Sequence, residues 1–381
     1  MMKRILLLSC STGQGHNSCA EAVKEYFEKQ NIFCEIYDSL NFIGENFAKF
    51  MSWGHSFMYR HVPGLFRWGY RYSEEHPGVF KRDSYIYKIL TTGTERLHRY
   101  IVDGHYDTVI CTHVFSAVIL TDMLKSYNLA VKTAFIATDY TCYPGIDACD
   151  LQKYFVADES LIDAYAKYGI PLHRIVAAGI PVRNIFFENR DRTEAKKFLD
   201  IDKNSPHLLI MCGSMGCGPI KTILRYIAKA LPDRAEVSVI CGTNKRLYRV
   251  LNYRYRKNSR IHIVGYTDKV SLYMDSADLY LTKSGGISVT EAAVKQRPML
   301  FINAVAGCEQ YNMDFFLRIH SAATEKKPWR LARKSIDLLR SESDRRYMEA
   351  MLRKHRRLNG AAHIYSELNR CDNEISAAKT P

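Results

Sequence analysis

The chain lacks a long apolar run, a paired-cysteine motif, an internal repeat and any low-complexity segment. No segment approaches the ~20 apolar residues that a membrane-spanning helix needs. The first apolar run stops at Ser9, before a polar glycine turn, which predicts a strand and not a signal peptide. The 11 cysteines include no CxxC pair and no histidine cluster at zinc spacing. We therefore expect no disulfide framework, no metal and a cytoplasmic location.

Composition indicates a globular protein with an acidic partner. Hydrophobic residues make up 47% and charged residues 25% of 381 residues, which is enough chain for two cores. The formal net charge of +14 favours nucleic acid, anionic lipid or a phosphorylated substrate as partner. No nucleic-acid recognition module is present, so we expect no nucleic-acid partner. The basic stretch at residues 326–357 is interleaved with apolar residues, as in solvated surface helices.

Residues 42–87 combine aromatic and basic side chains at unusual density. Such a mixture suits a membrane interface, where rings lie at headgroup depth and cations meet anionic lipid. An aromatic cap over the hydrophobic core is an equally good interpretation. The aromatic residues concerned are Phe42, Phe47, Phe50, Trp53, Phe57, Tyr59, Phe66, Trp68, Tyr70, Tyr72, Phe80, Tyr85 and Tyr87.

Strand-like apolar runs alternate with helical periodicity along the chain, which predicts an α/β fold with parallel sheets. A polar stretch at residues 189–205 separates two doubly wound, Rossmann-like domains. We place the domains at residues 1–188 and 189–343, with residues 344–381 forming a helix that packs back on the first domain and a tail that is disordered after Cys371. The expected strands cover residues 5–9, 33–37, 108–111, 133–137, 153–156, 174–177, 207–211, 236–240, 261–264, 278–281 and 299–302.

The stretch from Leu281 to Glu291 is typical of a nucleotide-diphosphate site. A buried strand is followed by Gly285, Gly286 and a helix start, so that backbone N–H groups and the helix dipole face an anion. Glu291, one turn into the helix, is placed to hold a ribose. Strand–glycine–helix junctions are also common in α/β proteins without a ligand, and that alternative stays open for this turn alone.

A second glycine turn, Gly13-Gln14-Gly15-His16, follows the first expected strand. The third glycine of a dinucleotide fingerprint is replaced by Ser18, which disfavours a dehydrogenase. His16 is expected at a helix N-terminus on the carboxyl edge of the sheet, where the helix dipole favours the neutral imidazole. A neutral imidazole suits a general base, and the alternative is a residue that only caps the helix.

Three further turns follow strands of the second half. The turn containing Gly213 and Gly216 lacks the GK[ST] ending of a P-loop, which disfavours an ATPase of that class. Asn244 ends another turn. Glu309 and Gln310 open a helix after the last expected strand and present donors and acceptors for sugar hydroxyls, although residues at such positions are often ordinary caps.

These segments, taken in order, resemble the monogalactosyldiacylglycerol synthase and processive diacylglycerol glucosyltransferase family, which is related to MurG-type glycosyltransferases. The resemblance covers most of the chain and implies a GT-B architecture, with two Rossmann-like domains facing each other across a cleft. It is carried by Gly13-Gln14-Gly15-His16, Ala137-Thr138-Asp139-Tyr140, Gly179-Ile180-Pro181-Val182, Gly213-Ser214-Met215-Gly216, Cys241-Gly242-Thr243-Asn244, Gly265-Tyr266-Thr267, Thr282-Lys283-Ser284-Gly285-Gly286 with Glu291, and Glu309-Gln310-Tyr311-Asn312.

The resemblance implies an inverting transfer of a hexose from a UDP-sugar to a membrane lipid such as diacylglycerol, without a catalytic metal or other cofactor. His16 would deprotonate the acceptor hydroxyl, and Asp139 would orient His16 or the acceptor. Ser214, Ser284, Gly285 and Gly286 would hold the diphosphate, Glu291 the ribose, and Glu309 and Gln310 the sugar. Gly15, Gly213, Gly216 and Asn244 complete the expected nucleotide-sugar site.

The resemblance implies three partners, a UDP-sugar, a lipid acceptor and anionic lipids. It also implies peripheral association with the inner face of the cell membrane. Two departures concern the motifs, because Ser284 stands where the family commonly has proline and the segment after Asp139 lacks the histidine of plant-type members. The alternatives are a MurG-like N-acetylglucosamine transferase, a UDP-sugar epimerase and a non-catalytic peripheral lipid-binding protein.

Overall fold

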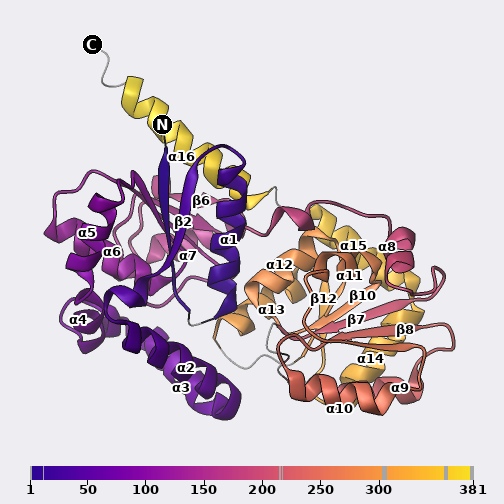
Figure 1. Ribbon diagram of the computed structural model, residues 1–381. Coiled ribbons are helices and arrows are strands. Elements are labelled where there is room, and N and C mark those ends of the chain that lie inside the picture. Colours follow the sequence, from indigo (N-terminus) through magenta and orange to yellow (C-terminus); the bar gives the residue numbers. More distant parts are fainter. Residues whose placement is uncertain are drawn as a thin grey trace. The chain divides into compact units, whose positions relative to one another are not determined.

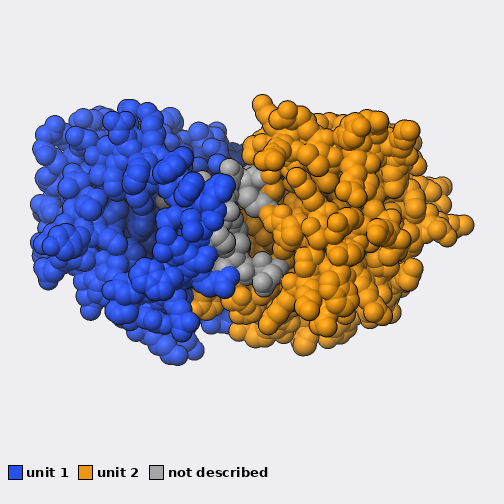
Figure 2. All heavy atoms as spheres, turned by 90° about the horizontal axis from the view of Figure 1, so that it is seen from below, with its two compact units in different colours: residues 1–184, 306–308, 357–381 blue, residues 185–305, 309–356 orange. Residues whose placement is uncertain are grey.

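The computed structural model describes residues 2–11, 13–213, 216, 218–302, 307–355 and 359–377 (Figure 1). The chain divides into two compact units, coloured separately in Figure 2. Unit 1 contains residues 1–184, 306–308 and 357–381, and unit 2 contains residues 185–305 and 309–356.

Unit 1 is built on a six-stranded parallel sheet in the order β2-β1-β3-β4-β5-β6. The central strands are buried on both faces, which accounts for their continuous apolar sequences. The strands are β1 (Arg4–Ser9), β2 (Phe33–Asp38), β3 (Thr108–Cys111), β4 (Lys132–Ile136), β5 (Lys153–Val156) and β6 (Ile175–Ala177). The helices are α1 (Gln14–Glu28), α2 (Glu45–His61), α3 (Pro63–Glu75), α4 (Tyr85–Thr91), α5 (Thr94–Asp103), α6 (Val114–Ser126), α7 (Ile162–Lys167) and α16 (Gly360–Ala377).

Unit 2 has its own six-stranded parallel sheet in the order β12-β11-β10-β7-β8-β9. Its strands are β7 (His207–Met211), β8 (Glu236–Ile240), β9 (Ile261–Val264), β10 (Leu279–Thr282), β11 (Met299–Phe301) and β12 (Ala322–Thr324). Its helices are α8 (Arg192–Phe198), α9 (Ile220–Ala230), α10 (Lys245–Tyr255), α11 (Val270–Ser276), α12 (Gly286–Val294), α13 (Cys308–Arg318), α14 (Pro328–Arg340) and α15 (Glu342–Lys354).

The predicted α/β class with two doubly wound, Rossmann-like domains is confirmed, and each expected strand has a counterpart. The chain adds β12, whose three residues are too short for a periodicity to show. No helix among the described residues is long and apolar enough to cross a membrane.

The C-terminal region differs from the prediction of one returning helix. Residues 344–356 group with unit 2, because Arg345 on α15 donates to the carbonyls of Leu338 and Leu339 at the end of α14. Only α16 belongs to unit 1, where the ring of Tyr365 packs edge-on against Phe27 of α1. Helix α16 continues to Ala377, past Cys371, where the sequence predicted the start of a disordered tail.

Each sheet has one point at which the strand order reverses. In unit 1, β1 lies between β2 and β3, so that the chain leaves β1 and β3 toward opposite edges. In unit 2, the same reversal occurs between β7 and β10. Ligands of open α/β sheets bind beyond the carboxyl ends of the strands at such a switch point.

Candidate functional site

The first switch point brings together the residues that follow β1, β3 and β4. These strands are paired in register, with Leu8 opposite Cys111 and Cys111 opposite Phe135. Their carboxyl ends therefore lie side by side. Gly15 and His16 are the second and third residues of α1, and Asp139 follows β4. Parallel pairing thus places the turn and the acid expected from the sequence at one sheet edge.

The His16 ring is oriented through its Nδ1 atom. Nδ1 lies 2.7 Å from the carbonyl oxygen of Thr112, which can only accept, so Nδ1 carries the proton and Nε2 has the basic lone pair. His16 is half-buried as a residue, and its ring meets His113 edge-on, with the ring centroids 4.5 Å apart. This arrangement fixes the tautomer that a general base requires.

A chain of hydrogen bonds connects His16 to Asp139. Nδ1 of His16 also lies 3.1 Å from the Thr138 hydroxyl, which lies 3.0 Å from the hydroxyl of Tyr143. Tyr143 in turn donates to Oδ2 of Asp139 at 3.0 Å, because a carboxylate only accepts. The backbone N–H of Thr138 donates to the Tyr143 oxygen. The Nδ1 proton of His16 is shared between the Thr112 carbonyl and the Thr138 hydroxyl, and the Thr138 hydroxyl can donate to Tyr143, which donates to Asp139. A chain with this direction stabilises positive charge on the imidazole.

Burial keeps both histidines of this edge neutral. It lowers the pKa of His16 from 6.5 to about 4, although the hydrogen bond to Thr112 opposes the shift. Burial also lowers the pKa of His113 well below its usual value, and the charge of a protonated His16 would add to that effect. His16 is therefore unprotonated and able to accept a proton near neutral pH.

In unit 2, the turn after β7 is held open by glycines in the left-handed region. Gly213, Gly216 and Gly218 have φ angles of +68°, +54° and +107°. A Cβ on Gly216 would lie 2.5 Å from the carbonyl oxygen of Cys241, so no other residue fits there. The predicted diphosphate ligand Ser214 lies outside the described residues.

Asn244 supports this turn from the next loop. Its Nδ2 donates to the carbonyl of Gly216 at 3.2 Å, and its Oδ1 accepts from the N–H of Leu247, which caps α10. These bonds tie the glycine turn to the start of α10. Asn244 thus shapes the loop, and its role as a nucleotide-sugar ligand stays a prediction.

The turn after β10 leads directly into α12, as the sequence predicts. Gly285 is the N-cap with φ −75°, and Gly286 is the first helical residue. Any residue could adopt this backbone conformation. Glycine matters at position 285 because it has no side chain that would cover the N-terminus of α12. The Ser284 hydroxyl instead donates to the carbonyl of Glu309 at 2.6 Å, and the Ser284 side chain is fully buried.

Glu309 and Lys283 form an ion pair beside both turns. Nζ of Lys283 lies 3.0 Å from Oε1 of Glu309, and a Cβ on Gly213 would lie 2.8 Å from Cε of Lys283. The lysine stem therefore crosses the β7 turn at the switch point. Asn312 is buried and donates to the carbonyl of Ser284, whereas Gln310 is exposed and donates to Asp314 on its own helix.

Glu291 lies on α12 one turn after the glycine junction and is largely buried. Burial and the nearby Glu291 carboxylate raise the pKa of Tyr280, whose hydroxyl lies 3.4 Å from the carbonyl of Met211. Glu291 thus lies on the helix that follows the glycine junction, close enough to Tyr280 of β10 for its charge to act there.

Several residues at the two switch points were not given a role by the sequence analysis. Thr138 and Tyr143 lie at the same sheet edge as His16, and Lys283 lies beside Gly213 and pairs with Glu309. The signal for Lys283 was its position directly after a predicted strand, beside Ser284. Tyr143 gave no such signal, because its contact with Asp139 depends on how the loop after β4 folds. Within the described residues, no group of three or more His, Cys, Asp or Glu side chains has metal-binding geometry.

Comparison with known proteins agrees with this division of the chain. The model of the monogalactosyldiacylglycerol (MGDG) synthase family matches residues 16–182, and that of the glycosyltransferase family 28 C-terminal domain matches residues 207–316. The crystal structure of Acinetobacter baumannii MurG aligns with a TM-score of 0.66 at 14% identity, covering 97% of this chain and 99% of that chain. The fold is that of a GT-B glycosyltransferase.

Two curated relatives identify the branch. The processive diacylglycerol beta-glucosyltransferase of Staphylococcus saprophyticus is 27% identical over 82% of this chain and 79% of its own length. The chloroplastic monogalactosyldiacylglycerol synthase of Spinacia oleracea is 26% identical over 87% of this chain and 65% of its own length. Both halves of the chain are thus similar to monogalactosyldiacylglycerol synthases and processive diacylglycerol glucosyltransferases, and the protein is an enzyme, a glycosyltransferase.

Proposed function

We propose that the protein transfers a hexose from a UDP-sugar to the free hydroxyl of diacylglycerol, with inversion at the anomeric carbon, and so makes a glycolipid. The observation that carries this proposal is His16, held by the Thr112 carbonyl as the Nδ1–H tautomer at the switch point of unit 1. The relatives named for diacylglycerol as acceptor support the choice of lipid.

The reaction is a single displacement. Nε2 of His16 takes the proton of the acceptor hydroxyl while the acceptor oxygen attacks the anomeric carbon. The bond between that carbon and the diphosphate oxygen breaks, and UDP leaves with the electron pair. His16 becomes an imidazolium, and the chain through Thr138 and Tyr143 to Asp139 stabilises that charge. Asp139 is thus a positioning residue in this scheme.

Unit 2 supplies positive charge that stabilises UDP as the leaving group. The N-terminus of α12 and the Lys283 ammonium offset the negative charge growing on the diphosphate, with Gly285 and Gly286 allowing close approach. With the Lys283 ammonium and the N-terminus of α12 in place, we propose that no metal is required. Glu291 binds the ribose, and Glu309 with Gln310 contacts the hexose. Gly213, Gly216 and Asn244 shape the loop beneath the phosphates.

The membrane contact of unit 1 is proposed to be the outer face of α2 and α3. The structure divides the aromatic region of residues 42–87: Phe42, Phe80 and Tyr87 are buried in the core, while others point outward. The interpretation as part of the core therefore applies to these three residues, and the membrane interpretation remains a proposal for the exposed ones. The exposed large side chains on α2 and α3 are Phe50, Trp53, Phe57, Met58, Leu65, Trp68 and Tyr72.

Rings and cations on these helices have the composition of a bilayer interface. Trp53 stacks on Phe57 and Trp68 on Tyr72, each one helical turn apart, and Arg71 on α3 is exposed and paired with Glu75. We propose that this face brings the active site to the cytoplasmic surface of the membrane, where diacylglycerol is presented.

The test is a donor panel. Purified protein is incubated with diacylglycerol vesicles and, in separate tubes, UDP-glucose, UDP-galactose or UDP-N-acetylglucosamine, and the lipid extract is analysed by mass spectrometry. A hexosyl lipid from one donor supports the proposal and names the sugar. Conversion of a UDP-sugar without any change in lipid mass would instead identify an epimerase, and an N-acetylhexosaminyl lipid would identify a MurG-like transferase.

A further inference from the structure

One helical layer of unit 2 carries a charge that the proposed transfer reaction does not use. The layer consists of α9, α10 and α14, which cover the same side of the sheet (Figure 1). α9 and α10 are successive right-handed crossovers in one direction from β7, and α14 packs against α9. We call this surface the basic layer.

Acidic residues are almost absent from the basic layer. Lysine and arginine occur three times on α9, four times on α10 and four times on α14, all exposed, whereas Asp337 is the one acidic residue in the three helices. Ordinary surface helices mix the two signs, as α15 does with Glu342, Asp344 and Glu349. The basic residues are Lys221, Arg225, Lys229, Lys245, Arg246, Arg249, Arg254, Arg330, Arg333, Lys334 and Arg340.

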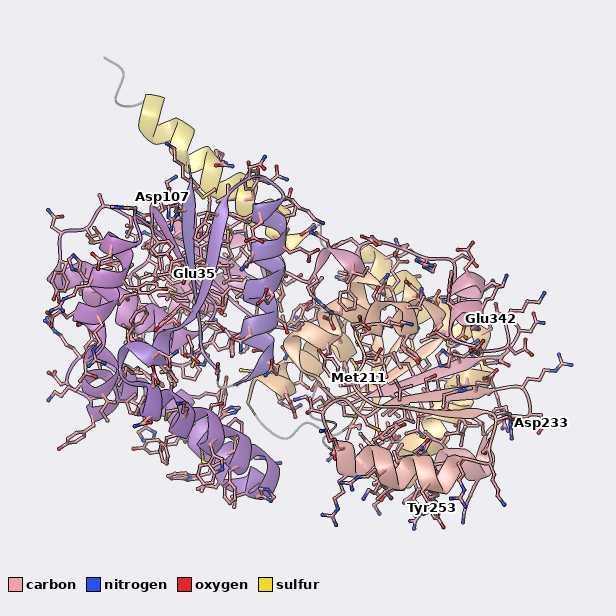
Figure 3. The ribbon with its side chains drawn as sticks, viewed as in Figure 1. Glu35, Asp107, Met211, Asp233, Tyr253 and Glu342 are labelled. Atoms are coloured by element: carbon pink, nitrogen blue, oxygen red, sulfur yellow. The ribbon has the colours of Figure 1, made fainter. Side chains whose placement is uncertain are left out.

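Exposed aromatic rings lie among these cations on each helix. The guanidinium of Arg225 lies over Tyr226 on α9, Arg256 over Tyr253 at the end of α10, and Arg330 over Trp329 on α14. Tyr253 is 70% exposed and lies on the outer side of α10 (Figure 3). Rings with a polar edge beside cations are the composition that partitions to the headgroup region of a bilayer.

We infer that the basic layer of unit 2 binds the surface of a bilayer that contains anionic lipid. This inference rests on the proposed function in one respect, since an enzyme that modifies a bilayer lipid must stay at that surface. The inference goes beyond the proposed function because it assigns lipid contact to unit 2, the unit proposed to bind the nucleotide sugar. A polynucleotide would also be attracted by the charge, but the exposed Tyr226, Tyr253 and Trp329, each beside a guanidinium, suit the headgroup region of a bilayer.

The test compares two triple variants of the full chain that lose the same charge. The first is Arg246→Gln, Arg249→Gln and Arg254→Gln on α10, where glutamine keeps the helix propensity. The matched control is Arg346→Gln, Arg353→Gln and Lys354→Gln on the mixed-charge helix α15. Binding is measured by co-sedimentation with phosphatidylcholine vesicles, with and without phosphatidylglycerol, at low and physiological salt.

We expect the α10 variant to bind phosphatidylglycerol vesicles on the order of a hundredfold more weakly than the parent, since each basic residue near an anionic surface contributes about fivefold. The α15 control should bind like the parent, and salt should weaken binding of the parent. Equal binding by the α10 variant, or equal loss in both variants, would overturn the inference. Tighter binding of the parent to duplex DNA or RNA than to these vesicles would overturn it as well.

A second readout separates this inference from the proposed function. Transfer to diacylglycerol in neutral detergent micelles, which present no anionic surface, should have the same rate in the parent and in both variants. Absence of transfer from all three proteins, with the difference in vesicle binding intact, would refute the proposed function and leave the lipid surface standing. Loss of transfer in the α10 variant alone would show that the helix is needed for folding or donor binding, and would overturn the inference.

Discussion

His16 has a distinct task at each ring nitrogen. Nδ1 is engaged by the Thr112 carbonyl and the Thr138 hydroxyl, which sets the ring orientation and leaves Nε2 for the acceptor. Helix position and glycine context were enough to predict His16 from the sequence. They could not predict the roles of Thr138 and Tyr143. The hydrogen bonds of these residues join His16 on α1 to the loop after β4, and they exist only once the sheet is formed.

Removal of the His16 imidazole should separate chemistry from donor binding. For His16→Ala we expect turnover to fall by roughly 10²–10⁴-fold, the usual contribution of a general base. The Kd for UDP, measured by calorimetry, should stay unchanged, because the residues proposed to bind the diphosphate and the ribose lie in unit 2. Glu291→Ala is the reciprocal variant, in which UDP binding weakens. Loss of UDP affinity in His16→Ala equal to its loss of turnover would contradict the assignment.

The pH dependence of transfer should reflect the lowered pKa of His16. The base works when neutral, so activity is retained above its pKa and falls as the pH drops through it. Because burial lowers that pKa from 6.5 to about 4, the acidic limb of kcat/KM should lie well below pH 6.5. Initial rates in detergent micelles over an acidic pH series would measure it. An acidic limb at or above pH 6.5 would show that another group, or an imidazole in a different environment, is the base.

At the scale of elements, the position of both sites follows from parallel strand order. The predicted strands, with the turn after each of them, are enough to place His16, Gly285 and Glu291 at the carboxyl edges of the sheets. Short or packing-dependent elements are less accessible to prediction: β12 has three residues, and the division of the C-terminal helices between two units depends on Arg345 and Tyr365. Periodicity shows which face of a helix is apolar and does not show which unit will cover it.

The glycine turn after β7 depends on Gly216. A Gly216→Ala change puts a Cβ 2.5 Å from the Cys241 carbonyl oxygen at a φ of +54°, so we expect the free energy of unfolding to fall by roughly 1–3 kcal/mol. The control is Gly265→Ala, where the nearest atom to a new Cβ is 3.9 Å away on Tyr248. Unfolding in denaturant would measure the free energy of unfolding of both variants. Equal stability of the two variants would mean that the turn relaxes without cost.

The outer face of α2 and α3 should contribute to membrane binding independently of charge. Trp53→Ser with Trp68→Ser removes two rings that are 61% and 63% exposed. We expect weaker co-sedimentation with neutral phosphatidylcholine vesicles and an unchanged melting temperature, because neither ring is in the core. The control is Tyr347→Ser, an exposed ring on α15. A lower melting temperature without any change in vesicle binding would favour a packing role for these rings.

At the scale of the whole molecule, part of the net charge of +14 is concentrated on one surface. The basic layer of α9, α10 and α14 is almost free of acidic groups, and the aromatic face of α2 and α3 belongs to the other unit. The net charge read from composition indicated an acidic partner but gave no location, since location depends on which helices share a side of a sheet.

The most direct test of the account is the anomeric configuration of the lipid product. The protein is supplied with diacylglycerol vesicles and the active UDP-sugar, which has an α linkage, and the glycolipid is purified and examined by proton NMR. One displacement with His16 as base predicts a β-linked hexose, formed without a covalent enzyme intermediate. An α-linked product, or failure to form any glycolipid while UDP still binds, would contradict it.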